Sequence, residues 1–245
     1  MKKNISTISA IIFWIILWQL IAAFINKPYI FASFTDTLKT FLTLIETKIF
    51  WISIFKTLTF TVSGFLLAFV SSLIFSVLAY KSKIFENFIS PILFVSKTVP
   101  VASIIVIILI WFGSKYLSIY ISFIVVFPQL YYAFLSGLKN IEVEMMEVAE
   151  IFRFSFLKKI LYVYRLSITP FLKNSISTVC SLAFKSSVAA EIIGNTISTI
   201  GEQIYYSKIY LDSASLFSYS FALIVISYFF EKSITFLVSR LGGKV

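Results

Sequence analysis

Residues 57–80 read TLTFTVSGFLLAFVSSLIFSVLAY and contain no charged side chain. An apolar stretch of this length is what an α-helix needs to cross the roughly 30 Å hydrocarbon core of a bilayer. The remainder of the 245-residue chain has the same character, because 59% of all residues are hydrophobic and only 13% are charged. A globule of this length buries only about 70–75% of its surface, so it could not hide this much apolar side chain from water. The composition therefore predicts a membrane protein and argues against a soluble enzyme.

Further stretches of similar length and low charge follow along the chain. We expect about six transmembrane helices, over residues 5–25, 57–80, 88–112, 117–137, 170–193 and 214–237. The predicted fold class is all-α and polytopic, with residues 1–245 forming a single transmembrane domain. Lys2 and Lys3 precede the first stretch, as in a signal peptide, but no small-x-small cleavage site follows it. We therefore interpret residues 5–25 as a retained helix.

The distribution of basic residues predicts the orientation, because positively charged loops stay on the cytoplasmic side. With the N-terminus inside, the inner side holds thirteen basic residues: Lys2, Lys3, Lys81, Lys83, Lys139, Arg153, Lys158, Lys159, Arg165, Lys173, Lys232, Arg240 and Lys244. The outer side holds six: Lys27, Lys39, Lys48, Lys56, Lys115 and Lys208. Both termini are therefore predicted to be cytoplasmic.

The residue inventory excludes several kinds of chemistry. The chain has no histidine and a single cysteine, Cys180, so the usual zinc ligand sets, a disulfide framework and any histidine-based catalytic triad are excluded. We expect no metal site and no enzymatic activity. The net charge of +10 could indicate nucleic-acid binding, but the lysines lie between apolar runs, as topogenic signals do. We therefore expect no nucleic-acid partner.

Three connecting segments are long enough to have structure of their own. On the outer side, residues 36–50 have helical periodicity, and residues 194–212 have turn residues at both ends. The inner segment 140–165 concentrates the polar residues of the chain. We expect Asn140 to be the N-cap of a helix whose first turn holds Glu142 and Glu144. Its apolar stripe consists of Met145, Val148, Ala149, Phe152 and Phe156. This amphipathic helix either packs on the membrane-embedded body or presents one face to a partner.

Three ionisable side chains inside the predicted spans stand out, one in 88–112 and two in 170–193. Lys97, Lys185 and Glu191 would each cost about 2.5–3.5 kcal/mol at a helix centre, so they are candidate residues of a translocation pathway and should face a wet interior. The alternative is snorkelling, in which the side chain reaches the headgroups. Pro100, three residues after Lys97, should kink or interrupt the third span and joins this set. The two lysines and one carboxylate would favour an anion.

Residues 147–153 read EVAEIFR, with an apolar run and Pro170 after them. This segment resembles the EAA loop of ABC-importer permeases, which reads roughly E-A-A-x-x-x-G; here Val148 replaces the first alanine and Arg153 the glycine. The resemblance spans about residues 17–240 in order, and the chain looks like a permease of the nitrate/sulfonate/taurine subgroup. The matching pieces are Leu17-Trp18, Ser63-Gly64-Phe65, Pro91, Val99-Pro100, Trp111-Phe112-Gly113, Phe127-Pro128, Gly137, Ala190-Glu191 and Ile200-Gly201.

The resemblance implies the type I importer fold, a bacterial cytoplasmic (inner) membrane location, and a homodimer of this chain. It also implies two ATP-hydrolysing subunits and an extracytoplasmic solute-binding protein or lipoprotein. The coupling residues it implies are Met145, Glu147, Val148, Ala149, Phe152 and Arg153. The chain has seven glycines and none in the spacing of a P-loop, so we expect ATP-Mg to be bound by the partner and no cofactor by this chain.

The substrate is the least determined part of this interpretation. A small anion such as a sulfonate, nitrate or taurine is the first choice, and a vitamin precursor such as a thiamine-type pyrimidine is the alternative. A self-contained channel or an ion-coupled carrier is the alternative from a different class. A carrier of that kind would be expected to have acidic residues or broken helices at the midplane, whereas Glu191 is the single acidic candidate that we weigh inside a span.

Overall fold

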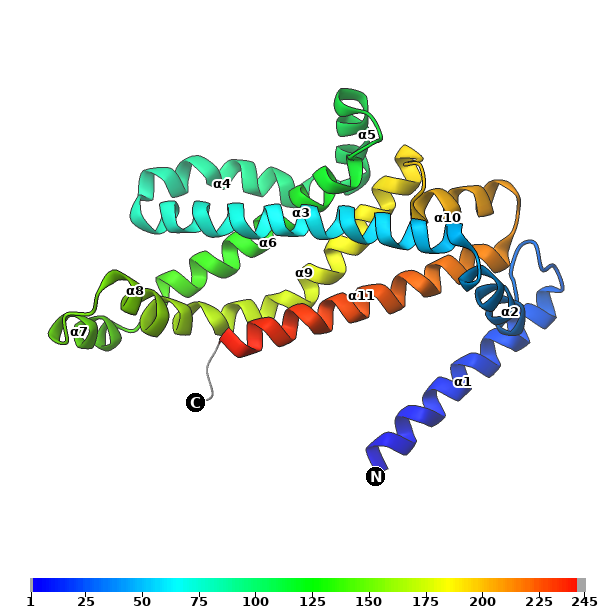
Figure 1. The fold of residues 1–245 in the computed structure, drawn as a ribbon, viewed down its shortest axis with the longest axis horizontal. Helices are drawn as coiled ribbons and strands as arrows, with labels where there is room; N and C mark the ends of the chain where they lie inside the picture. The colour runs from blue at the N-terminus through cyan, green and yellow to red at the C-terminus, as the bar shows by residue number, and fades with distance from the viewer. Residues whose placement is uncertain (1, 242–245) are drawn as a thin grey trace.

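The computed structural model describes residues 2–241, and the side chains of residues 8–240. In this part of the chain every regular element is a helix, as the sequence predicts. The elements are α1 (Lys2–Ile25), α2 (Phe34–Ile45), α3 (Lys48–Lys81), α4 (Lys83–Thr98), α5 (Val101–Phe112), α6 (Leu117–Lys139), α7 (Val143–Ile151), α8 (Phe156–Lys159), a π-helical turn η1 (Ile160–Tyr164), α9 (Arg165–Gly194), α10 (Ile200–Ile209) and α11 (Ser213–Leu241). Chain direction can be followed by colour in Figure 1.

Polar side chains mark where several of these helices begin. Ser33 caps α2, Thr47 caps α3, Ser82 caps α4 and Thr199 caps α10, each accepting a hydrogen bond from a backbone N–H of the first turn. Serine and threonine are preferred at this position because their hydroxyl oxygen satisfies an N–H that has no partner within the helix.

Helix α6 lies at the centre, packed between α3 and α9. Two glycines allow the close approach. A Cβ atom at Gly64 would lie 2.6 Å from the backbone oxygen of Ile119, and one at Gly137 would lie 2.6 Å from the Cα of Ile168. Small residues of this kind let helix backbones pack closely in a membrane, where lipid supplies little hydrophobic driving force for helix association.

The main apolar cluster fills the space around these crossings. Helices α3, α6, α9 and α11 contribute to it. Its buried residues are Phe65, Ala68, Val126, Leu130, Ala133, Phe134, Leu172, Ile176, Val179, Cys180, Ala183 and Val238. Cys180 is fully buried in it as a small apolar side chain.

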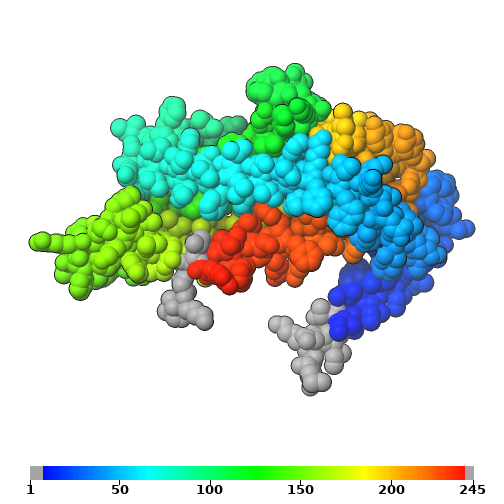
Figure 2. All heavy atoms as spheres, in the orientation of Figure 1, coloured from blue at the N-terminus to red at the C-terminus, as the bar shows by residue number. Residues whose placement is uncertain are grey.

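The connections gather at two ends of the bundle. The α3–α4 turn, α7 and α8 lie at one end, and α2 and α10 lie at the other (Figure 1). These two groups match the loops predicted to be inner and outer, respectively. Helix α1 stands away from the bundle, and Figure 2 shows it projecting from one end. Trp18 and Gln19 attach it: the Trp18 ring packs against Phe34 and Phe217 and donates to the backbone oxygen of Ala32 at 3.0 Å, and Gln19 hydrogen-bonds to Thr35.

The transmembrane prediction is confirmed in outline. Within the described residues, five helices are long and apolar enough to span a membrane, and a bent pair gives up to six. The third predicted span, 88–112, is not one helix: α4 and α5 meet at Val99-Pro100 with a bend of 105°. Proline lacks the N–H needed to continue a helix, and the residue before it avoids the helical region, so the interruption has the predicted cause.

The outer segment 36–50 needs a correction. Its helical periodicity does not correspond to one continuous helix, because α2 ends at Ile45 and α3 has already begun at Lys48. The predicted turns that flank 194–212 are present, since Asn195 and Leu211 both have positive φ at the two ends of the α10 connection.

The α6–α9 crossing gives a first prediction. We expect Gly137→Val to lower the free energy of unfolding by about 1–3 kcal/mol, because the added methyl groups would overlap the Ile168 backbone and force the helices apart. Thermal unfolding of the detergent-solubilised protein would measure the loss. Ala23→Val, at an exposed position on α1, adds similar bulk and is the control. Equal melting temperatures for the two variants would show that the crossing tolerates a larger separation.

Candidate functional site

Helix α7 carries the EVA motif at the end of the molecule that it shares with the α3–α4 turn (Figure 1). Glu147 and Val148 are exposed, whereas Ala149 is only 1% exposed and is the one buried residue of the helix. The small alanine side chain therefore lets α7 lie against the body. The two preceding motif residues point away from it.

A tight turn ends α7 and reverses the chain. The N–H of Phe154 donates to the carbonyl of Ala149 at 2.8 Å, and the N–H of Arg153 donates to the carbonyl of Glu150 at 2.9 Å. Arg153 has φ +46°, the left-handed conformation that this C-terminal motif requires. Glycine adopts this conformation without strain, which explains why a glycine suits this position. Arginine has a Cβ atom, so it adopts the same backbone conformation at a steric cost.

Two details of the predicted inner helix are wrong. Asn140 does not cap its N-terminus; it ends α6, and α7 begins at Val143 with Glu142 at the N-cap position and no side-chain cap. The apolar stripe also does not continue through one helix, because the turn at Arg153 separates Phe156 from α7. Residues 160–165 belong to a helix that runs unbroken from 156 to 194.

The apolar residues around the turn divide into two groups. Met145 is half-buried, and Ala149 is buried. Ile151 and Phe152 are 76% and 71% exposed. Of the two alternatives left open for this stripe, packing on the body therefore holds for Ala149, which is covered by this chain, whereas Phe152 is exposed.

The break between α4 and α5 places Lys97 at the end of a helix. Lys97 and Pro100 are exposed on the surface of this chain. The Lys97 ammonium lies 3.8 Å from the centroid of the Tyr132 ring of α6, a cation–π contact. An aromatic face thus stabilises the charge where the helix ends.

Lys185 and Glu191, six residues apart on α9, have opposite surroundings. Lys185 is exposed, and no ion pair forms on it among residues 8–240. Glu191 has no exposed surface. The expectation that all three intramembrane charges face a wet interior is therefore not met by Glu191 in this conformation.

The Glu191 carboxylate accepts hydrogen bonds from three other parts of the chain. One oxygen accepts from Thr57 Oγ1 at 2.8 Å and from the backbone N–H of Gly201 at 3.1 Å, and the other accepts from Ser118 Oγ at 3.2 Å. Thr57 in turn accepts from the N–H of Ile200 at 2.9 Å. The carboxylate thus joins α3, α6, α9 and the start of α10. Gly201 is needed there, since a Cβ at this position would lie 2.2 Å from the Cβ of Glu191.

Sequence reasoning identified Glu191 but missed its partners. Thr57 and Thr61 on α3, and Ser118 and Ser122 on α6, are buried hydroxyl residues four apart. The second member of each pair extends the network, because Thr61 Oγ1 donates to Ser187 Oγ at 2.7 Å and Ser122 Oγ donates to the Thr61 backbone oxygen at 3.3 Å. Hydroxyls repeated at i and i+4 along an apolar span are the signal that could have found this face.

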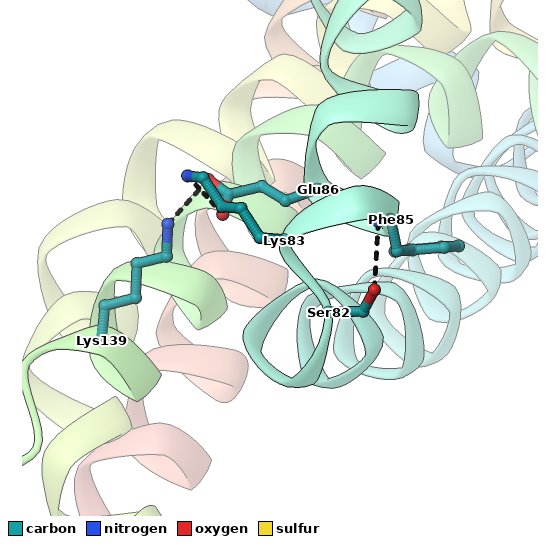
Figure 3. A network of polar contacts seen from close by, with 5 residues as sticks. All are labelled: Ser82, Lys83, Phe85, Glu86 and Lys139. Carbon is teal, nitrogen blue, oxygen red and sulfur yellow. Dashed lines mark hydrogen bonds and ion pairs between the residues drawn. The ribbon is translucent and has the colours of Figure 1, made fainter.

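An ion-pair cluster at the opposite end was also missed. Glu86, on α4, pairs with Lys83 at 3.1 Å and with Lys139 of α6 at 2.7 Å, and both ion pairs found among residues 8–240 use this carboxylate (Figure 3). The sequence signal was present, because Glu86 is the only acidic residue between positions 47 and 141. The cluster ties the start of α4 to the end of α6.

Comparison with known proteins identifies the protein family to which this chain belongs. The pattern of the family described as "Binding-protein-dependent transport system inner membrane component" matches residues 64–243, which include α7, the turn at Arg153 and, from the Glu191 network, Ser118, Glu191 and Gly201. The chain belongs to this family of ABC-importer permeases. It is also similar to a probable ABC transporter permease protein of Haemophilus influenzae, at 26% identity over 228 residues that cover 92% of each chain.

A second relative matches over a shorter region. The trimethylamine N-oxide transport system permease protein TmoV of Pelagibacter ubique is 34% identical over 98 residues, which are 40% of this chain and 14% of that protein. The fold, the membrane-spanning helices and the family now agree: this permease is a multi-pass membrane protein of a binding-protein-dependent transport system.

The Glu191 network gives the second prediction. We expect Glu191→Ala to destabilise the permease by about 1–3 kcal/mol for each donor left unpaired, because Thr57, Ser118 and Gly201 are enclosed with it. Glu191→Gln should cost less, since its oxygen can accept from Thr57 and Gly201 while its amide donates to the Ser118 hydroxyl. Thermal unfolding in detergent would rank the variants. Equal stability of the alanine and glutamine variants would show that the network contributes nothing.

Proposed function

We propose that this chain forms the translocation pathway of an ABC importer and couples transport to ATP hydrolysis by two separate ATPase subunits, through α7. The observation that carries the proposal is the division of α7 into an anchored and an exposed side. Ala149 fixes the helix to the body, while Glu147, Val148 and Phe152 are exposed at its surface. An exposed apolar surface beside a carboxylate on a predicted cytoplasmic segment suits a protein partner better than water.

The family supports the remaining partners by its description as binding-protein-dependent. In our proposal a second copy of the permease completes the pore, and an extracytoplasmic solute-binding protein or lipoprotein delivers the solute at the end that bears α2 and α10. Both termini then lie in the cytoplasm, as the distribution of lysine and arginine predicts. ATP-Mg belongs to the ATPase subunits.

For the substrate, we propose a small anion of the sulfonate, nitrate or taurine type. The exposed ammonium groups of Lys97 and Lys185 support an anion because neither has a carboxylate partner among residues 8–240. The name of the Pelagibacter relative suggests a small, methylated amine oxide as the second candidate. Lys97 already covers the Tyr132 ring at 3.8 Å, which leaves that aromatic face closed to a cationic methylated group.

The coupling role can be tested by cross-linking. In a Cys180→Ser background, we expect cysteines at positions 147, 148, 151 and 152 to cross-link to the ATPase subunit in the assembled complex, because these side chains are exposed on or beside α7. A cysteine at position 149 is the matched control, since Ala149 is buried against this chain. Cross-links to lipid alone from all four exposed positions would contradict the proposal.

The anion pathway can be tested by uptake. In proteoliposomes that hold the complete importer, we expect Lys97→Ala and Lys185→Ala to reduce uptake of nitrate or taurine, and Lys→Glu at either position to reduce it further, because a carboxylate would repel the anion. Lys208→Ala, on α10 outside the spans, is the control. Full uptake by both alanine variants would show that these lysines snorkel instead.

A further inference from the structure

A groove opens between α3, α6 and the start of the long helix formed by α8, η1 and α9. Its volume is about 300 Å³. The walls are mostly apolar and include Leu73 and Val77 of α3, Leu138 of α6, and Ile160 and Ile168 of the long helix. Ile168, which lines the groove, is also the residue that α6 approaches closely at Gly137.

Basic side chains line the same groove. Lys81, at the end of α3, and Arg165, at the start of α9, both contribute to its lining. Neither forms an ion pair within the described side chains, where Glu86 takes the lysines Lys83 and Lys139 instead. The Nε of Arg165 is buried without a hydrogen-bond partner. A buried N–H of a charged group is costly when it has no hydrogen-bond acceptor. The Arg165 Nε therefore suits a ligand that brings an acceptor into the groove.

The backbone is irregular at this place. Residues 160–164 form a π-helical turn, and Ile160 and Tyr164 at its two ends line the groove. A π-helical turn inside an α-helix is rare and is frequently found at functional sites. The groove is lined by residues of α8 and of the end of α3. These elements lie at the end of the bundle that holds the α3–α4 turn (Figure 1), which is the predicted cytoplasmic side.

We propose that this groove binds one anionic phospholipid of the inner leaflet. An acyl chain would lie along Leu73, Val77 and Ile168, and the phosphate would accept hydrogen bonds and charge from Lys81 and Arg165. Basic pockets between transmembrane helices on the cytoplasmic side favour such headgroups. A free inorganic anion would satisfy the basic residues but leave the apolar walls uncovered, which is why the lipid is the better fit.

The test uses the full-length permease in nanodiscs that contain phosphatidylglycerol with a photoreactive acyl chain. We expect adducts to map to residues 73–81 and 160–168. Lys81→Gln with Arg165→Gln should lower this labelling about five-fold for each charge removed, from about 1 kcal/mol per basic residue near an anionic surface. Val77→Trp, which fills the groove and keeps both charges, should lower it as well.

Matched controls separate the site from general effects. Lys158→Gln with Lys159→Gln removes two basic residues that do not line the groove, and Ile74→Trp introduces the same side chain at an exposed position of α3 that does not line it. Both should keep wild-type labelling. A phosphatidylcholine probe should label the groove weakly, and millimolar inorganic phosphate should not displace phosphatidylglycerol.

Three results would overturn the proposal. Wild-type protein without adducts in either segment would do so even if the variants failed to fold. Displacement by inorganic phosphate would identify a free-anion site instead of a lipid site. Cross-links between two copies through a cysteine at position 77, with no lipid adduct, would assign the groove to the interface between permease subunits.

Discussion

The close approach of α6 to α3 and α9 is the constraint on which the rest of this permease depends. At Gly64 and Gly137 the helix backbones are so close that a Cβ atom on either glycine would overlap a backbone atom of the neighbouring helix. That separation is what allows hydroxyl side chains as short as those of Thr61, Ser122 and Ser187 to reach from helix to helix. The same proximity lets Glu191 meet donors from α3 and α6 at 2.8 and 3.2 Å. Polar groups that would be costly in lipid are thereby satisfied inside the bundle.

The apolar patterning could be predicted from the sequence because it depends only on neighbouring residues. The presence of five to six apolar spans, the interruption at Pro100 and the turns around α10 all follow from local composition, and the structure confirms them. The lengths were predicted less well, because the helices at 48–81 and 156–194 extend beyond the predicted spans 57–80 and 170–193. The assignment of Asn140 failed for a local reason as well. Asparagine suits either end of a helix, and α6 extends far enough that this residue ends one helix instead of beginning the next.

The surroundings of Glu191 could not be predicted, since its partners are distant in the sequence. Thr57 is 134 residues away and Ser118 is 73 residues away. A single sequence places these residues on helices but does not determine which faces meet. The same limit applies to α7, where helical periodicity groups Ala149 with Phe152 although the turn at Arg153 buries one and exposes the other. The positive φ of Arg153, which only the structure reveals, sets the turn that leaves Ala149 buried and Phe152 exposed.

The unbroken helix from 156 to 194 has a mechanical consequence. Its 39 residues correspond to about 58 Å, nearly twice the thickness of the hydrocarbon core. One end adjoins the turn that follows α7, and the other end carries Glu191 and the connection to α10. A stiff rod of this kind transmits tilt along its whole length, so a displacement at its α8 end reaches the opposite leaflet without passing through a loop. The π-helical turn at 160–164 and Pro170 both lie toward its α8 end, so any bending is concentrated there, beside the proposed lipid groove.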